Sequence, residues 1–164
     1  MGRFVLTTDA QDLCPCGSGK RFGICCRPLP YWRPVCPNPG MQGHSLLRPQ
    51  SACFMNIPAD AVHAFLQNDE RLYGVEDTPQ REFWTYWGDP AFDTPPHGTL
   101  CFGDLELQEN GMLLATALSD TRMEVLLNLL HPLNLDAPQM QRDPFPRLEK
   151  PRRRASGRKH RHSS

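Results

Sequence analysis

Residues 14–26 read CPCGSGKRFGICC and carry the strongest structural signal in this 164-residue chain. They hold four cysteines within thirteen residues, arranged as Cys-x-Cys, then eight residues, then Cys-Cys. A zinc ion prefers four soft ligands in a tetrahedron and can take all of them as thiolates. The spacing therefore predicts one structural zinc ion in a compact knuckle with four ligands: Cys14, Cys16, Cys25 and Cys26.

The residues between the two cysteine pairs suit a tight loop around a metal. Gly17 and Gly19 tolerate positive φ, which permits a turn whose backbone N–H groups point toward the sulfurs. Phe22 is the natural residue to cover the site and exclude water. Zinc with four thiolates carries a net negative charge. Three neighbouring basic residues offset that charge: Lys20, Arg21 and Arg27.

This segment resembles the SEC-C zinc motif, which reads CPCGSG, two basic residues, an aromatic residue, and then Cys-His or Cys-Cys. The motif is known from the C-terminal zinc tail of the protein-export ATPase SecA and from many small bacterial proteins. Gly23, Ile24 and Arg27 depart from the Lys-rich, Gly-terminated version in SecA. The match runs residue by residue through Cys14, Pro15, Cys16, Gly17, Ser18, Gly19, Lys20, Phe22, Cys25 and Cys26.

The resemblance implies bound zinc and a protein-interaction or adaptor role. It also implies a protein partner in chaperone, export or ribosome-linked machinery. We therefore expect a structural zinc-binding protein in the cytoplasm. We do not expect an enzyme, because zinc held by four protein ligands has no open position for water or substrate. No histidine is paired with Cys, Ser or Asp at a triad or metalloprotease spacing.

Other uses of the four cysteines fit the sequence less well. The disulfide framework of a secreted protein needs a signal peptide, and the N-terminus offers only the short apolar run Phe4-Val5-Leu6. A bond between adjacent Cys25 and Cys26 would be strained, because neighbouring Cα atoms lie about 3.8 Å apart and unstrained disulfides prefer about 5.5–6 Å. A Cys-x-Cys redox pair would leave Cys25 and Cys26 unexplained.

The remaining cysteines share no ligand spacing with one another. Cys36, Cys53 and Cys101 are predicted to be buried thiols, which behave as small apolar residues. A second metal site formed by Cys36, His44 and Cys53 is the alternative.

Positive charge is concentrated at the C-terminal end of the chain. Eighteen Lys and Arg balance eighteen Asp and Glu, but residues 147–164 hold eight of the bases and only one acid, Glu149. Such a segment can contact phosphates without reading sequence, or it can serve only as a solubilising end. The alternative function is therefore a nucleic-acid- or ribosome-associated protein that uses the knuckle and this tail. No apolar run approaches the ~20 residues of a membrane helix, so we expect no membrane contact.

The chain divides by composition into five segments of an α+β protein. Seventeen prolines argue against a bundle of long helices. After Pro138 the chain is expected to be disordered, and residues 28–50 form an extended or irregular arm that Tyr31, Trp32 and Val35 dock onto the body. The segments are a lead-in (1–13), the zinc knuckle (14–27), a Pro/Gly-rich arm (28–50), a small strand–helix body (51–136) and a flexible Pro-rich and basic tail (137–164).

The first half of the body is predicted to contain one strand and one helix. Residues 51–57 suit a short strand, and a helix is predicted from Pro58 to about Asn68 by apolar residues at helical spacing. Residues 71–80 are mixed and predict a loop. The aromatic run at 82–87 is expected to fill the core, although a base- or ligand-stacking surface is the alternative.

The second half carries the clearest pattern, a β-hairpin followed by an amphipathic helix. Residues 99–108 and 112–117 flank Asn110-Gly111, a strong hairpin signal because both residues tolerate positive φ. The apolar residues of the first strand switch parity, which predicts a bulge at Gly103-Asp104. A helix is predicted to begin at the N-cap Ser119 and to end at His131-Pro132.

Overall fold

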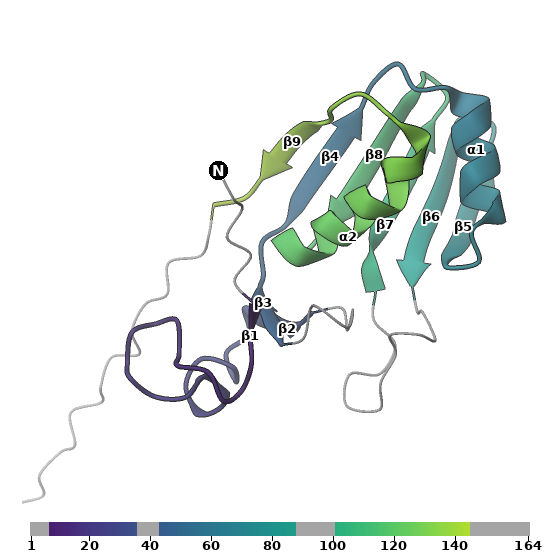
Figure 1. The fold of residues 1–164 in the computed structure, drawn as a ribbon. Coiled ribbons are helices and arrows are strands. Elements are labelled where there is room, and N and C mark those ends of the chain that lie inside the picture. Colours follow the sequence, from purple (N-terminus) through teal and green to yellow (C-terminus); the bar gives the residue numbers. More distant parts are fainter. Residues whose placement is uncertain (1–6, 36–42, 88–100, 145–164) are drawn as a thin grey trace, which may run out of the picture.

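The computed structural model describes residues 7–35, 43–87 and 101–144. It confirms a mixed α+β fold, which consists in these residues of two α-helices and two antiparallel sheets (Figure 1). The six-stranded sheet has the order β5-β6-β7-β8-β4-β9 and the three-stranded sheet the order β1-β3-β2. Strands of the larger sheet are β4 Gln50–Phe54, β5 Leu72–Thr78, β6 Arg81–Trp87, β7 Cys101–Gln108, β8 Met112–Ala117 and β9 Gln139–Arg142.

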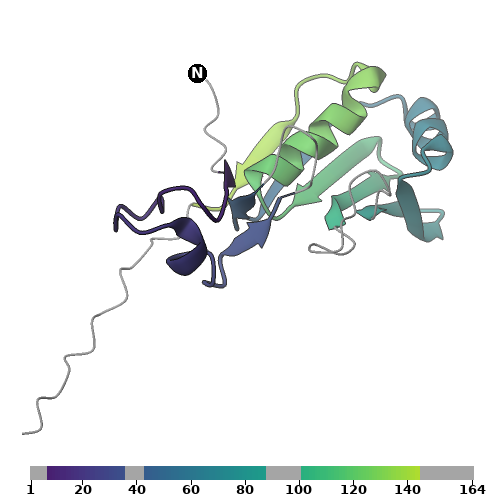
Figure 2. The same ribbon diagram turned by 60° about the horizontal axis from the view of Figure 1, so that its bottom comes forward.

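Both helices lie on the same face of the six-stranded sheet (Figures 1 and 2). They are α1, Ala59–Asn68, and α2, Asp120–Leu130. The buried core lies between helices and sheet, and it is formed mainly by Leu, Phe, Ala and Met side chains. Within the described residues, no helix is long and apolar enough to cross a membrane.

The predicted hairpin is confirmed, and its turn uses one left-handed residue. Gly111 has φ 76° and donates its N–H to Gln108 O at 3.1 Å, whereas Asn110 is not among the residues with positive φ. The register pairs Gln108 with Met112, so three residues form the loop. A three-residue hairpin loop with glycine in the left-handed position is a common solution.

A bulge lies at the start of β7, one residue before the predicted position. Tyr86 pairs with Gly103 and Trp87 pairs with Cys101, which leaves Phe102 as the extra residue. Gly103 has φ 153°, and a Cβ on it would lie 2.3 Å from the carbonyl oxygen of Thr116. Only glycine fits there, because β8 approaches the backbone too closely for a side chain.

Helix α2 begins as the sequence predicts. Ser119 is the N-cap, and its hydroxyl accepts the backbone N–H of Arg122 at 3.2 Å, which satisfies one free donor of the first turn. Met123, Leu126 and Leu130 are buried against the sheet. The α-helix ends at Leu130 and continues as a short 3-10 turn, His131–Leu133.

The loop predicted at residues 71–80 is wrong, because β5 occupies most of it. Leu72 pairs with Tyr86 on the helix-covered face, and Tyr73 pairs with Thr85 on the opposite face. A bulge between Gly74 and Glu76 breaks the alternation of apolar and polar residues. The partner strand β6, rather than the pattern of β5 itself, stabilises this strand.

The prediction of disorder after Pro138 is also wrong for the first residues that follow it. Strand β9 pairs with β4, matching Arg142 with Gln50 and Met140 with Ala52. Met140 packs against the core, so the body extends beyond the predicted boundary at residue 136. The basic residues 147–164 lie outside the described part of the chain.

Trp32 of the arm predicted at 28–50 packs on the knuckle rather than on the body. The described parts of the arm form β2, Trp32–Pro34, and β3, His44–Leu46, which pair with each other and with β1, Thr7–Thr8, of the predicted lead-in. Trp32 packs on Phe22 with ring centroids 4.7 Å apart, within the knuckle's own apolar cluster. The knuckle and this three-stranded sheet therefore share one small core.

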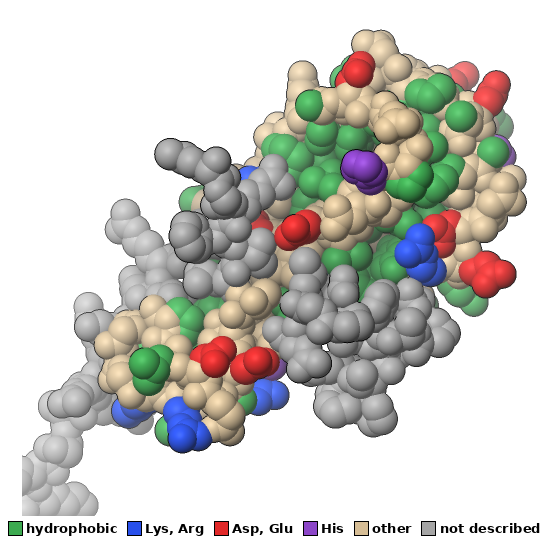
Figure 3. All heavy atoms as spheres, in the orientation of Figure 1, with side chains coloured by type: hydrophobic (Ala, Val, Ile, Leu, Met, Phe, Trp, Pro, Cys, Tyr) green, Lys and Arg blue, Asp and Glu red, His purple; other side chains and the backbone are tan. Residues whose placement is uncertain are grey.

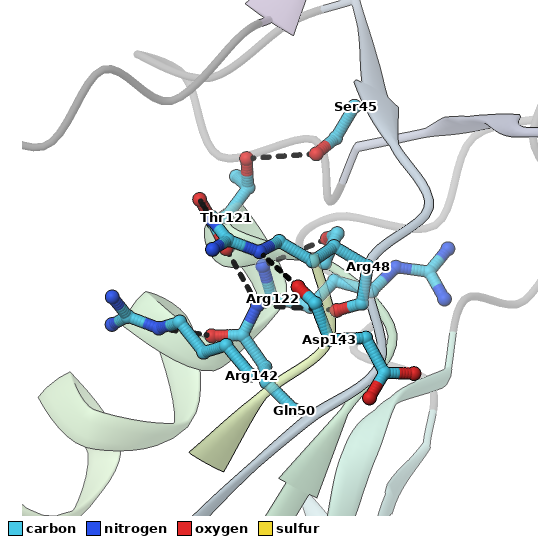
Figure 4. A network of polar contacts seen from close by, with 9 residues as sticks. Ser45, Arg48, Gln50, Thr121, Arg122, Arg142 and Asp143 are labelled. Atoms are coloured by element: carbon cyan, nitrogen blue, oxygen red, sulfur yellow. Dashed lines mark hydrogen bonds and ion pairs between the residues drawn. The ribbon is translucent and has the colours of Figure 1, made fainter. Parts of the chain in front are cut away.

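Strand β3 joins the knuckle unit to the body (Figure 4). Thr121 Oγ1 and Ser45 Oγ lie 3.3 Å apart, and both side chains are buried. Arg122 donates from Nη2 to the carbonyl oxygen of Pro34 at 3.1 Å. We call these four residues the junction. Two hydrogen bonds from α2 to the small sheet therefore fix the knuckle unit against the body.

A second set of polar contacts holds the end of β9 beside the junction. Arg48 donates from Nε to the carbonyl oxygen of Asp143 at 2.8 Å, and its Nη1 lies 3.3 Å from Asp120 Oδ2 (Figure 4). Gln50 donates to Asp120 Oδ1 at 2.6 Å and accepts from Arg142 Nε at 3.3 Å. The Asp120 carboxylate also lies in the first turn of α2, where the helix dipole favours negative charge.

Candidate metal centre

The four cysteines of the predicted site lie together in space. Their Sγ atoms all lie within 4.8 Å of one another, and Cys16 Sγ is 3.6 Å from Cys25 Sγ. Zinc–sulfur bonds of about 2.3 Å in a tetrahedron place neighbouring sulfurs about 3.8 Å apart. The cluster is therefore of the size that one zinc ion requires, and four clustered thiols could bind one such ion.

Backbone hydrogen bonds bring the first cysteine pair into position. Cys14 donates its N–H to Lys20 O at 2.8 Å, and Phe22 donates to Asp12 O at 2.8 Å. Between these bonds, Leu13 and Arg21 form an isolated antiparallel bridge. The loop inside this bridge contains Gly17 and Gly19, whose φ values of 77° and 75° are the positive values expected from sequence.

The second cysteine pair follows a single 3-10 turn. This turn, Phe22–Ile24, is closed by hydrogen bonds from the N–H groups of Cys25 and Arg27 to the carbonyl oxygen of Phe22, each 3.1 Å long. The turn reverses the chain, so Cys25 and Cys26 face the first pair. The hydroxyl of Ser18 lies 3.2 Å from Cys25 Sγ.

An aromatic cluster covers one side of the cysteines. Phe22 is fully buried, and it packs edge-to-face on Trp32 and also on His44 of β3, with centroids 5.7 Å apart. Cys14 and Cys26 belong to the same buried cluster. The expected covering role of Phe22 agrees with this packing, which keeps water from two of the four sulfurs.

The close approach of the thiols shifts their pKa values in opposite directions. The pKa of Cys16 falls to about 6, chiefly because the Ser18 hydroxyl and the Cys14 thiol donate hydrogen bonds to its thiolate. Burial raises the pKa of Cys26, and hydrogen bonds with Cys14 and Cys16 raise it further. Cys16 therefore ionises more readily than Cys26, and a divalent cation that binds both must displace the proton of Cys26.

The other candidate residues do not join this cluster. Cys53 is half-buried in β4 and Cys101 is exposed at the start of β7, so the prediction of a buried thiol is wrong for Cys101. His44 lies in the small sheet, and Cys36 lies outside the described residues. Within the described ranges, the four knuckle cysteines are the single group of three or more His, Cys, Asp or Glu ligands that could hold a metal.

The aromatic run of β6 divides between the two faces of the sheet. Tyr86 is buried in the core and Trp84 packs against it, as predicted. Trp87 is 53% exposed and packs edge-to-face on Tyr73, with centroids 6.5 Å apart. The core prediction is therefore wrong for Trp87. The alternation of strand side chains explains the division, and it is visible only once the run is known to be a strand.

A family model described as the SEC-C motif matches residues 12–28. No curated protein and no solved structure matches the chain. The matched residues contain all four cysteines and both hydrogen bonds that close the first loop. The chain therefore carries a SEC-C motif with a four-cysteine cluster, consistent with a zinc-binding motif like that of SecA.

Proposed function

We propose that this chain is a structural zinc-binding protein whose knuckle acts as a protein-interaction or adaptor module. The four clustered sulfurs support the metal assignment. When bound, zinc would cross-link the two cysteine pairs and so stabilise a loop too small to fold on its own core. A centre with four protein ligands leaves no position for substrate, so we propose no catalytic role for it.

The surface of the knuckle supports an interaction role. Leu13 and Ile24 are 74% and 76% exposed, and they adjoin Cys14 and Cys25 of the metal cluster in the chain. Lys20 and Arg21 are exposed in the same knuckle, and Figure 3 shows basic side chains at its outer edge with acidic side chains close by. Exposed apolar side chains ringed by charge are typical of protein-binding surfaces. A partner would offer an apolar pocket bordered by charged residues.

The partner and compartment rest on the motif alone. By analogy with SEC-C proteins, we propose a cytoplasmic partner in chaperone, export or ribosome-linked machinery. The knuckle departs from the SecA version at Gly23, Ile24 and Arg27, so we expect a partner of its own rather than SecA's.

A quantitative capture experiment tests the proposal. Full-length protein and Ile24→Asp would be used as bait in native cytosol treated with ribonuclease, with Val75→Asp as the control. Val75 is 65% exposed on β5, far along the chain from the knuckle. We expect the same protein partners with wild type and Val75→Asp and their loss with Ile24→Asp. Equal capture by all three baits would contradict an interaction through the knuckle.

The second candidate is nucleic-acid association through the knuckle and the basic tail together. The observation that favours it is the contact between Arg48 Nε and Asp143 O, which fixes the chain beside the junction just before the basic segment begins. The described chain therefore ends beside the junction, and the exposed Lys20 and Arg21 of the knuckle add positive charge. Loss of all partners on ribonuclease treatment would favour this candidate over the first.

A further inference from the structure

The six-stranded sheet has one face that no described element covers, which we call the open face. Directly paired residues of an antiparallel sheet point to the same side. Tyr86, Leu105 and Ala115 are buried beneath the helices, so their strand neighbours must point to the other side. Figure 2 shows α1 and α2 on one side of the sheet only.

An apolar stripe crosses the middle of the open face. Cross-strand pairing places Phe83 of β6, Leu114 of β8 and Cys53 of β4 in one row. Glu106 of β7 lies in this row between Phe83 and Leu114. The next row contains Met112, which pairs with Gln108. Met55 adjoins the stripe, with its Sδ 3.6 Å from Cys53 Sγ, and is 47% exposed. The centre of this face is therefore more like an interface than a solvated surface.

The charged groups of the open face have hydrogen-bond or ion-pair partners within the sheet. In β6–β8 its charged residues are Arg81, Asp104 and Glu106. Arg81 Nη1 lies 3.8 Å from Glu106 Oε1, which also accepts a hydrogen bond from Gln108 at 2.9 Å. Asp104 accepts from the hydroxyl of Thr85 at 2.7 Å. A partner that covers this face can leave the Arg81–Glu106 pair in place, and it would have to offer a positive charge to Asp104.

We propose that the open face binds a second copy of this chain in a two-fold symmetric dimer. A symmetric dimer needs one patch that is complementary to itself, and this patch carries an apolar centre and both signs of charge. Six strands about 4.8 Å apart, each about six residues long, present roughly 500 Å². Two such faces bury about 1,000 Å², which reaches the lower limit of a specific interface.

The dimer would place two knuckles on one particle. Each knuckle lies beyond one end of its six-stranded sheet (Figures 1 and 2), so packing of the two sheets would leave both knuckles accessible. Two linked binding sites raise the apparent affinity for a partner with two matching sites, without any new contact. The dimer goes beyond the proposed function of the knuckle and does not depend on it.

The test is the oligomeric state of the full chain and of two matched variants. Sedimentation equilibrium of zinc-loaded wild type from about 1 to 100 μM should give twice the 18.6 kDa chain mass. The double variant Met112→Lys/Leu114→Lys should raise the dimer dissociation constant at least about hundredfold. Lysine suits this purpose because its aliphatic stem can lie along the sheet of the monomer while its charge reaches water.

The control is Ile24→Lys, which replaces an equally apolar and more exposed side chain on the knuckle. It should dimerise like wild type. A monomeric wild type at 100 μM would overturn the proposal, and so would an unchanged dissociation constant in the double variant. If the double variant loses its circular-dichroism signal, Leu114→Lys alone replaces it. Because Ile24→Asp tests the knuckle separately, failure of one proposal leaves the other intact.

Discussion

Thr121 of α2 and Ser45 of β3 share a buried hydroxyl–hydroxyl hydrogen bond of 3.3 Å. The strand that supplies Ser45 is buried on both faces. Leu46 belongs to the knuckle's apolar cluster and His44 packs on Phe22, whereas Ser45 faces the helix. Any loosening of the knuckle core should therefore reach the first turn of α2, although the body has its own core.

Loss of the metal should unfold the knuckle and spare the sheet. Structural zinc contributes about 10–16 kcal/mol of apparent binding free energy in zinc-finger peptides, so Cys16→Ser should abolish tight binding of one zinc ion. Hydrogen exchange should then increase in residues 12–28 and in the first turn of α2, while β6 and β7 stay protected. Native mass spectrometry supplies the stoichiometry.

The chelated wild type is the control, and it should reproduce the exchange pattern of Cys16→Ser. Simultaneous loss of protection in β6 and β7 would show that the two apolar clusters form one cooperative unit.

Zinc affinity should increase with pH. Cys16, with a pKa of about 6, is already largely a thiolate at pH 7. The Ser18 hydroxyl lowers the pKa of Cys25, but the Cys16 thiol and burial outweigh it and raise that pKa, and burial raises the pKa of Cys26. Binding near pH 7 must therefore release at least two protons, from Cys25 and Cys26.

If binding releases two protons, the affinity for zinc should fall at least about hundredfold for each pH unit by which the pH is lowered. Competition with a chromophoric chelator at pH 6.5, 7.0 and 7.5, corrected for protonation of the chelator, measures it. A slope below tenfold per pH unit would contradict the raised pKa values of Cys25 and Cys26.

Gly103→Ala should be among the most destabilising substitutions in the body. A Cβ there would lie 2.3 Å from Thr116 O and 2.6 Å from Leu126 Cδ1, so β8 or α2 must move. We expect a loss of at least about 3 kcal/mol in the free energy of unfolding, measured by urea denaturation.

The matched control is Gly111→Ala, which has φ 76° but nothing within 4 Å of its Cβ. It should cost only the backbone strain of about 1–2 kcal/mol. Equal losses in the two variants would mean that backbone strain alone, and not the close approach of β8, decides the cost at Gly103.

Strand β9 should contribute measurably to stability, although the sequence predicts disorder there. A chain ending at Asp136 loses the pairing with β4 and the packing of Met140. We expect its free energy of unfolding to fall by about 2–4 kcal/mol, from one partly buried Met and several hydrogen bonds. A chain ending at Pro144 keeps both and should match full-length protein within about 0.5 kcal/mol. Equal stability of the two shortened chains would show that β9 adds nothing.

Local signals explain which elements the sequence predicts. The hairpin depends on a turn within three residues, helix α2 on its N-cap, and the metal cluster on ligands that lie within thirteen residues of one another. All three are determined by residues close together in the chain, so a local sequence pattern is enough to predict them.

The missed strands depend on distant partners. Arg142 pairs with Gln50 across more than ninety residues, and Thr7 pairs with Ser45. Neither β9 nor β1 shows an alternation of apolar and polar residues that would predict a strand. Both lie at the edge of a sheet, where backbone hydrogen bonds to one neighbour largely hold the strand. The open face was equally hidden, since the sequence shows Phe83, Leu114 and Cys53 in three separate segments.

If residues 147–164 bind polyanions, RNA affinity should fall steeply with salt. Each phosphate neutralised by Lys or Arg releases counterions, and the eight bases of this segment limit the log–log slope to about −6 on single strands. A chain ending at Pro144 should lose most of this binding, because residues 1–146 hold seventeen acids against ten bases. Fluorescence anisotropy with a labelled oligonucleotide from 50 to 300 mM salt measures both. If the shortened chain binds RNA with full affinity, the binding site is the knuckle, through Lys20, Arg21 and Arg27. If the full chain shows no salt-sensitive binding to RNA, the nucleic-acid function is wrong.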